Sequence, residues 1–266
     1  MAPSLTQHKV KTNAQPGWMN TSLIALSLLA ALTAVILTGR SVRRHLPDHH
    51  LSGDSKDAVK LAMGLVATMT ALLLGLLVSS SKGTYDAERT EVIQMAAKST
   101  FLDRVLSAYG PEAAEARGLF HNAVTEAVKH MWPEDHDVIA QASPSAGDAV
   151  YAAIQHLTPR DDTQRAWKAQ AATLAMDLGQ LRMLLQAQMV PSIPKPMLYS
   201  VFCWLIILFV SFSLLAPPNA TTTLALLAAA VSVAVAVFLI MELDQPLGGF
   251  IRISSEPMLK AIAQFH

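Results

Sequence analysis

The sequence predicts an all-α membrane protein with four transmembrane helices and a helical extramembrane insert between the second and third spans. Three observations support this fold class. The 266 residues are 52% hydrophobic but only 15% charged, whereas a soluble domain carries about 25% charged residues. Four stretches of 19 to 21 residues contain no charged side chain, and about 20 helical residues cross a hydrocarbon core about 30 Å thick. The remaining chain shows helical periodicity and no alternating strand pattern.

The four charge-free stretches are expected to be transmembrane helices, because a helix satisfies its own backbone hydrogen bonds in lipid. They comprise residues 21–39, 61–81, 197–216 and 221–241. The first stretch is longer than the apolar core of a signal peptide, which has about 7–15 residues, and no small-x-small cleavage pattern follows it. We therefore expect an uncleaved span, the alternative being a signal peptide removed near residue 40.

The spans divide the chain into five regions. We expect an N-terminal arm at 1–20, a first transmembrane pair at 21–81, the insert at 82–196, a second transmembrane pair at 197–241, and an interfacial turn with a short helix at 242–266. Four crossings place both termini and the insert on one side of the membrane. Positive charge does not choose that side, because the first loop has five Lys and Arg residues and the opposite segments near the membrane have six.

Helical patterns follow one another through the insert. A first helix ends before Gly110-Pro111, and further helices are expected at about 112–131 and 149–157. The longest helix is predicted to begin with Thr158 as its cap and Pro159 at the first helical position. Its apolar residues form a heptad stripe of Trp167, Ala171, Leu174, Leu178, Leu181 and Leu185. We predict that this stripe packs within the insert; a contact between subunits is the alternative.

Composition and motifs argue against several classes of function. The net charge is zero, which argues against nucleic-acid binding, and the single cysteine, Cys203, allows neither an internal disulfide nor a cysteine-based zinc site. Phosphate-loop, zinc-protease and serine-hydrolase motifs are absent, so we expect no enzyme, no catalytic residue and no cofactor. The spans hold no Asp, Glu, Lys, Arg or His side chain, which argues against a proton-coupled transporter.

A passive pore remains compatible with these spans, because hydroxyl groups and apolar constrictions can line one. The candidates at the second span are the hydroxyl residues Thr68, Thr70, Ser79, Ser80 and Ser81.

The second span also has one face of small residues, formed by Gly64, Thr68, Ala71 and Gly75. Small faces let helices approach closely in lipid. We predict that this face packs against another span of the same chain, and the alternative is that it lines a symmetric assembly.

The loop after the first span contains metal-ligand side chains at His45, Asp48, His49 and His50. The segment contains a proline, and no partner ligand at helical spacing supports a site. We therefore predict no bound metal, with a divalent-cation site as the alternative.

A distinctive string follows the fourth span. Glu242 and Asp244 lie where the helix leaves the bilayer, Pro246 disfavours its continuation, and Gly248-Gly249 permits a tight turn. Beyond the turn, Arg252 can reach an acid or a lipid phosphate. Pro257 begins a last helix whose Leu259, Ile262 and Phe265 are expected on the membrane or the insert. We predict that the string turns the chain at the interface; a ligand site is the alternative.

The string Glu-Leu-Asp-x-Pro-x-x-Gly-x-Ile-Arg-x-Ser-x-x-Pro after an apolar span resembles the end of the bestrophin-like domain of bacterial membrane proteins. The similarity extends over roughly 57–265 and includes the prolines at 193–196, the second span and the helix at 91–109 that continues from it. Bestrophins are pentameric anion channels whose pore is lined by the second membrane helix. The sequence differs from bestrophins in two places: residues 61–81 lack the aromatic side chains of a bestrophin neck, and only Glu242 and Asp244 correspond to the acidic calcium clasp.

The resemblance implies a homo-oligomer in the bacterial inner membrane, in contact with lipid, with its insert and termini in the cytoplasm. The first hypothesis is a passive anion channel along the second span. The alternative is a non-conducting membrane-anchored sensor or scaffold whose insert, 82–196, binds a protein partner.

Overall fold

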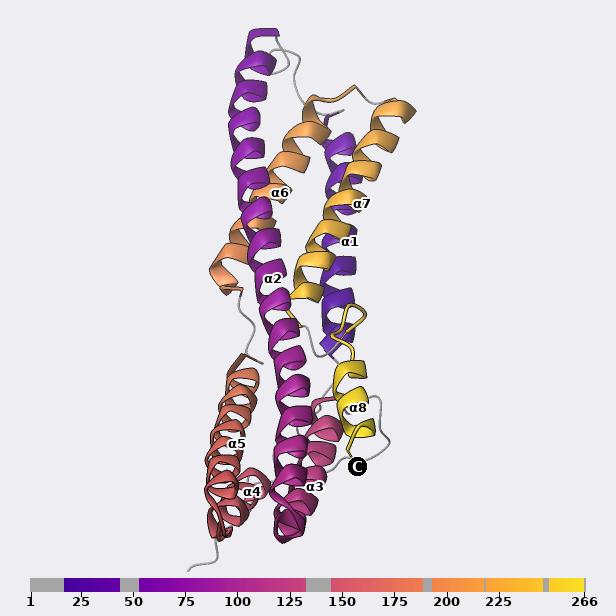
Figure 1. Ribbon diagram of the computed structural model, residues 1–266. Helices are drawn as coiled ribbons and strands as arrows, with labels where there is room; N and C mark the ends of the chain where they lie inside the picture. Colours follow the sequence, from indigo (N-terminus) through magenta and orange to yellow (C-terminus); the bar gives the residue numbers. More distant parts are fainter. Residues whose placement is uncertain are drawn as a thin grey trace, which may run out of the picture.

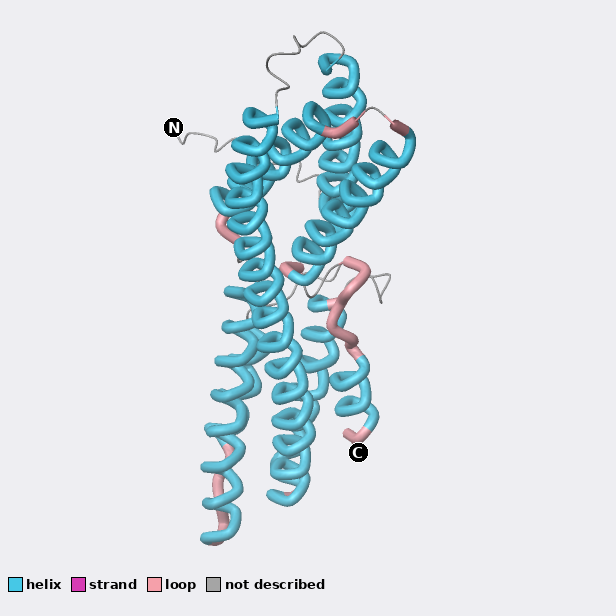
Figure 2. The backbone as a smooth tube through the Cα atoms, turned by 90° about the horizontal axis from the view of Figure 1, so that it is seen from above, coloured by secondary structure: helices cyan, strands magenta, loops and turns pink. Residues whose placement is uncertain are grey.

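The computed structural model describes residues 17–43, 53–132, 145–188, 193–217, 219–245 and 249–265. Within these ranges every regular element is a helix and no strand occurs (Figure 2). The molecule is elongated, and one helix, α2 (Gly53–Tyr109), runs through its whole length (Figure 1). The all-α prediction is therefore confirmed.

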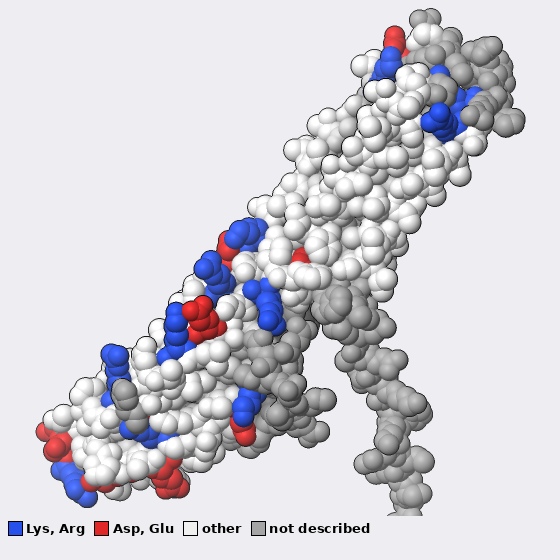
Figure 3. Space-filling view, turned by 90° about the vertical axis from the view of Figure 1, so that its right-hand side faces the viewer, with Lys and Arg blue, Asp and Glu red and all other residues white. Residues whose placement is uncertain are grey.

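The membrane half is formed by α1 (Gly17–Arg43), the first part of α2, α6 (Lys195–Leu215) and α7 (Ala220–Leu243). Each of these four helices is long and apolar enough to cross a membrane, which confirms the four predicted spans. They share a core of aliphatic side chains and one phenylalanine: Leu28, Leu32, Ile36, Leu77, Val201, Leu205, Phe209, Ala230, Val237 and Ile240. Figure 3 shows an almost uncharged band over this half, with charged residues at its far end and over the other half.

The extramembrane half packs around the second part of α2. It consists of the 3-10 turn η2 (Pro111–Ala113), α3 (Ala114–Met131), α4 (Ser145–His156), α5 (Asp162–Gln188) and α8 (Glu256–Ala263). Its separate core contains the fully buried Trp132, Leu102 and Ile154. The α2 helix ends at Tyr109, before Gly110, which adopts a φ of 117° that favours glycine.

The start of α5 differs from the prediction. The helix begins at Asp162, and Thr158 and Pro159 precede it. The backbone N–H of Gln164 donates to Asp161 Oδ1 over 2.6 Å, so Asp161 is the residue whose side chain caps the helix. The predicted start was wrong because the aspartate three residues later supplies the acceptor that the first helical N–H groups need.

The heptad stripe of α5 faces the core of the extramembrane half. Ala171, Leu174 and Leu185 are buried, and Trp167, Leu178 and Leu181 pack against the same cluster while partly buried. The prediction of packing within the insert is therefore confirmed. Ile262 of the last helix, α8, and Phe265 just after it likewise pack on this core, while Leu259 is exposed.

Contacts at the ends of the membrane helices show the relative direction of α1 and α7. Thr21 near the start of α1 donates to Glu242 near the end of α7, and Arg40 near the end of α1 donates to Thr223 near the start of α7. These two helices therefore run antiparallel. The start of α1 and the C-terminal segment consequently lie at the end of the bundle that faces the extramembrane helices (Figure 1).

Candidate functional site

The side chains on one side of α2 are uncovered along almost the whole helix. Only 11% of its membrane-spanning window is buried within the chain, against 22%, 28% and 22% in α1, α6 and α7. Most of the circumference of α2 is exposed in the membrane part, and one series of exposed residues recurs every three or four positions along the helix, as expected for one face. We call this face the outward stripe of α2; it comprises Leu65, Thr68, Leu72, Gly75, Ser79, Gly83, Asp86, Thr90, Ile93, Ala97, Phe101 and Arg104.

The small residues of the second span lie on this uncovered side. Gly64, Thr68, Ala71 and Gly75 are all exposed, and a Cβ atom added at Gly64 or Gly75 would meet nothing within 4 Å. The prediction that they pack against another span of the same chain was wrong, because α6 and α7 lie against the opposite side of α2, where Leu77 is buried in the core they share. In a membrane, these small residues therefore contact either lipid or a second protein chain.

The five hydroxyl candidates divide between the two sides of α2. Thr68, Ser79 and Ser80 are exposed, and the Thr68 hydroxyl donates to the Gly64 carbonyl over 2.9 Å. Thr70 and Ser81 are buried inside the chain. The Thr70 hydroxyl donates to the Val66 carbonyl over 2.8 Å, so a single chain presents only the first three hydroxyl groups to its surroundings.

The interfacial turn is organised by Glu242, whose side chain is 1% exposed. Its Oε2 accepts a hydrogen bond from the Thr21 hydroxyl over 3.0 Å, and its Oε1 accepts from the backbone N–H groups of Phe250 and Ile251. A buried carboxylate needs such donors. Glu242 therefore ties the start of α1, the end of α7 and the segment after the turn into one junction.

Gly249 is required by this arrangement. Its φ of 110° is in the left-handed region, and a Cβ atom would overlap Glu242 Oε1. Only glycine allows the backbone to approach the carboxylate so closely. These contacts join the string after the fourth span to the start of α1, while Pro246 and Gly248 lie outside the described residues.

The segment beyond the turn is held on the extramembrane half. The indole N–H of Trp132 donates to the Ile253 carbonyl over 2.8 Å, and the Ser254 hydroxyl accepts from the Glu256 N–H at the start of α8. Pro257 occupies the first turn of α8. Asp244 lies at the end of α7, and the Arg252 side chain is exposed.

A buried acid that sequence reasoning missed lies just beyond the membrane part of α2. Glu88 is 2% exposed, and its Oε1 has no hydrogen-bond partner. Burial, with smaller contributions from the charges of Glu91 and Asp244, raises the pKa of Glu88 to about 7. Helical spacing could have found it, because Glu88 follows the buried Ser81 by seven residues and precedes the buried Val92 by four.

A second network joins α2, α3 and the segment that follows α8. Arg117 donates to Asp103 from Nε over 2.7 Å and from Nη2 over 2.9 Å, and His121 contacts the same carboxylate while stacking on Phe265. Burial acts to raise the pKa of Asp103, but the hydrogen bonds and charges of Arg117 and His121 outweigh it and hold that pKa below its usual value. His121 is therefore a half-buried contact residue rather than a free surface histidine.

No group of three or more histidine, cysteine or acidic side chains that could hold a metal ion occurs in the part of the chain that the structure describes. The candidate metal loop with His45, Asp48, His49 and His50 lies outside that part.

A model of the bestrophin-like domain matches residues 28–258 of the chain. The match begins within the first span, includes the other three spans, α3 to α5 and the interfacial turn, and ends within α8. The chain belongs to the bestrophin-like family. A crystal structure of a bacterial bestrophin homologue from Klebsiella pneumoniae, carrying a point mutation, is similar over 90% of this chain and 97% of that one, with a TM-score of 0.61 and 15% sequence identity. None of the curated proteins matches the chain.

The bestrophin-like fold explains how the candidate residues are placed. One continuous helix carries both the membrane part and the extramembrane part of the outward stripe, so the two parts keep a common orientation. The family match and the apolar helices establish an integral membrane protein of a family associated with ion transport. The stripe and the interfacial turn are the two features from which a specific function can be argued.

Proposed function

We propose that this bestrophin-like protein forms a homo-oligomeric, passive anion pathway in the bacterial inner membrane, lined by the outward stripe of α2 from each copy. The observation that carries the proposal is the continuation of the stripe beyond the membrane. Ile93 is 47% exposed and Phe101 is 46% exposed, although both follow the charged segment after residue 81. Lipid chains cannot cover apolar side chains there, whereas further copies of the chain can.

The membrane part of the stripe has the chemistry of a narrow neutral pathway. Leu65 and Leu72 are exposed, the hydroxyl residues Thr68 and Ser79 lie between and after them, and no acid is present on this part. Rings of apolar side chains form constrictions that gate by dewetting. In this proposal leucine rings take the place of aromatic side chains, and Thr68 and Ser79 supply the polar lining. The exposed Ser80 lies beside the stripe, next to Ser79.

Reconstituted full-length protein tests the proposal. Liposomes that contain it should release chloride faster than empty vesicles, and L65A/L72A should raise the flux several-fold by widening the constriction. A matched control is L26A/L224A, which removes two leucines of similar exposure from α1 and α7 and should leave the flux unchanged. Absence of chloride flux above that of empty vesicles would overturn the proposal.

The proposed orientation places the extramembrane half and both termini in the cytoplasm. Met183 on α5 is 72% exposed and provides a reporter position once Cys203 has been replaced by alanine. A cysteine at position 183 should react with a membrane-impermeant maleimide only after spheroplasts are permeabilised. Reaction in intact spheroplasts would show that the extramembrane half lies on the opposite side of the membrane.

A second candidate function, a non-conducting scaffold, is favoured by one observation on α5. Its outer side presents the uncharged Thr173, Met176, Gln180 and Met183, all exposed. Such a surface can bind a protein partner, including another copy of the chain. A photo-crosslinker at position 183 should yield only self-adducts if the channel proposal holds, whereas adducts with a different protein support the scaffold.

A further inference from the structure

The charged residues on the extramembrane part of α2 are sorted by side. Between residues 82 and 104, the exposed charged side chains are three bases and one acid, namely Lys82, Asp86, Arg89 and Arg104. The other acids of this segment lie within the chain: Glu88 and Asp103 are 2% and 3% exposed, and Glu91 is half-buried. The uncovered side of this part of α2 therefore carries a net positive charge in each copy.

Arg104 is the charge on the outward stripe that no other described residue neutralises. The other charged residue of the stripe, Asp86, forms an ion pair with Lys82 one turn earlier on the same helix. Among the residues that the structure describes, the Arg104 side chain forms neither a hydrogen bond nor an ion pair. The neighbouring carboxylate of Asp103 accepts two hydrogen bonds from Arg117 instead. The guanidinium group of Arg104 is therefore available to an ion from outside the chain.

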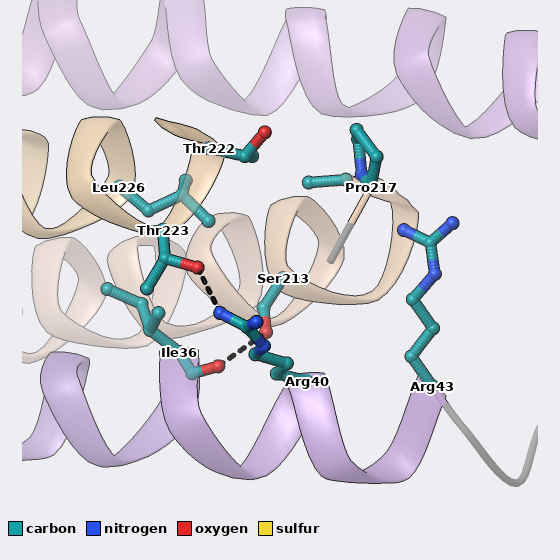
Figure 4. Close-up of a pocket in the computed structure, with 9 residues that line it drawn as sticks. Ile36, Arg40, Arg43, Ser213, Pro217, Thr222, Thr223 and Leu226 are labelled. Atoms are coloured by element: carbon teal, nitrogen blue, oxygen red, sulfur yellow. Dashed lines mark hydrogen bonds between the residues drawn. The ribbon is translucent and has the colours of Figure 1, made fainter. Parts of the chain in front are cut away.

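Arg40, at the opposite end of the membrane half, shows the contrast with an arginine that the chain itself holds. Its Nη1 donates to the Thr223 hydroxyl over 2.6 Å (Figure 4), which fixes the side chain between α1 and α7. Arg104 lies near the other end of the molecule, in the last two turns of α2. It follows Asp86 by 18 residues, which is about 27 Å along a helix.

The proposed assembly brings the Arg104 side chains of its copies together. This step rests on the proposed function, because stripes around a common axis place Arg104 of every copy around that axis. Like charges repel one another, and an anion between them offsets the repulsion. Rings of arginine or lysine are one device by which pores select anions, and a charged mouth raises the local concentration of counter-ions.

We propose that a ring of Arg104 side chains, one from each copy, sets the preference of the pathway for small inorganic anions such as chloride over cations. The ring lies at the extramembrane mouth, far from the constriction that Leu65 and Leu72 form in the membrane. Arg104 selects the charge of the ion at the entrance, and the leucines set the width. Removing the Arg104 charge should change which ion passes without closing the pathway.

Reversal potentials of the full-length protein in planar lipid bilayers, measured in asymmetric sodium chloride, test this assignment. The wild type should pass chloride more readily than sodium. R104Q should lower the ratio of chloride to sodium permeability several-fold, R104E should lower it further, and R104K should preserve it because the charge is kept.

The matched control is R165Q, which also removes one exposed positive charge from each copy. Arg165 lies on α5 and not on the stripe, but at the same end of the extramembrane half, since the adjacent Gln164 donates to the Tyr109 carbonyl over 3.0 Å. R165Q should leave the permeability ratio unchanged. Native mass spectrometry checks that every variant keeps the oligomer of the wild type.

The outcomes separate this inference from the proposed function. Absence of current from the wild type overturns the proposed function and this inference with it. A chloride-selective wild-type current whose permeability ratio is the same in R104Q and R104E overturns this inference alone. Equal shifts in R104Q and R165Q overturn the assignment to Arg104, because they show an effect of overall charge.

A second measurement needs no variant. Salt screens an exposed ring of charges, so raising the sodium chloride concentration on both sides should weaken the chloride preference of the wild type. A preference that does not change with salt contradicts selection by the Arg104 ring.

Discussion

The membrane half and the extramembrane half share α2 but use different chemistry to hold it. In the membrane half, aliphatic residues such as Leu77 and Ile240 fill the core, and hydroxyl groups such as that of Thr70 donate to their own helix. In the extramembrane half, an ion pair between Lys98 and Asp177 and the Asp103 network supplement the apolar core. Charges are costly in lipid, so they gather beyond the membrane and at the junction.

The difference shows that the junction carries the structural constraint. Glu242 is buried where the two chemistries meet, and its carboxylate accepts hydrogen bonds from two other segments, the start of α1 and the segment after the turn. Each half can tolerate a conservative change within its own core. The junction depends on one carboxylate and one glycine, and we therefore expect the largest effects there.

The largest effect is expected for G249A. The added Cβ atom would overlap Glu242 Oε1 and the φ of 110° would be strained, which together cost about 3 kcal/mol or more. Thermal unfolding in detergent should show a large fall in Tm. The control is G110A in the extramembrane half, where φ is also positive but the Cβ atom would meet the end of the Glu112 side chain at 2.9 Å and otherwise only Gln164 at 4.0 Å; its cost should be about 1–2 kcal/mol. Equal losses in the two variants would contradict a special role for the junction.

A smaller loss is expected for D103N in the extramembrane half. The substitution breaks the paired hydrogen bonds from Arg117 and should cost about 2–3 kcal/mol. Because folding lowers the pKa of Asp103, its contribution is complete above the ordinary pKa of 3.8 and is lost as the pH falls through the lower folded value. D103N should therefore also make the free energy of unfolding depend less on pH in the acid range.

The control for this prediction is D86N, which removes an exposed ion pair with Lys82 on the same helix. Exposed pairs contribute little, so the loss should stay below about 0.5 kcal/mol. If D86N and D103N lower the Tm equally, the assigned difference between a buried network and a surface pair is wrong.

The smallest effect concerns Glu88 and depends on pH. Folding raises its pKa from 4.5 to about 7, so the contribution of the protonated group is complete below pH 4.5 and is lost as the pH rises through 7. E88Q should be close to wild type at pH 5 and more stable by about 1–2 kcal/mol at pH 8. Unfolding at both pH values, with the exposed E126Q as control, checks this; a stability difference that does not change with pH would contradict it.

The spans could be predicted from the sequence because a run of consecutive residues is enough to recognise each one, without any knowledge of tertiary contacts. Charge-free runs of a length set by the bilayer occur at residues 21–39 and 221–241, and the helices α1 and α7 contain them. The buried stripe of α5 could also be predicted from the sequence, since Leu174 and Leu185 belong to a regular heptad spacing.

The contacts of the junction could not be predicted in the same way. Thr21 and Glu242 are separated by 221 positions, and no local pattern connects them. The side of α2 that stays uncovered was also wrongly assigned, because small residues at Gly64 and Gly75 allow close packing but do not specify the partner. Glu88 was missed because the charge suggested a surface position, although the helical spacing placed it inside.

The central claim is that copies of this chain, and not lipid, cover the outward stripe of α2. A cryo-electron microscopy structure of the full-length protein in lipid nanodiscs tests it most directly. We predict several copies around an axis, with Leu65 and Leu72 of each α2 toward the axis in the membrane and Ile93 and Phe101 of the same stripe toward it outside the membrane, where the stripes of the copies meet. Single copies, or an assembly in which the outward stripe faces lipid, would contradict the account.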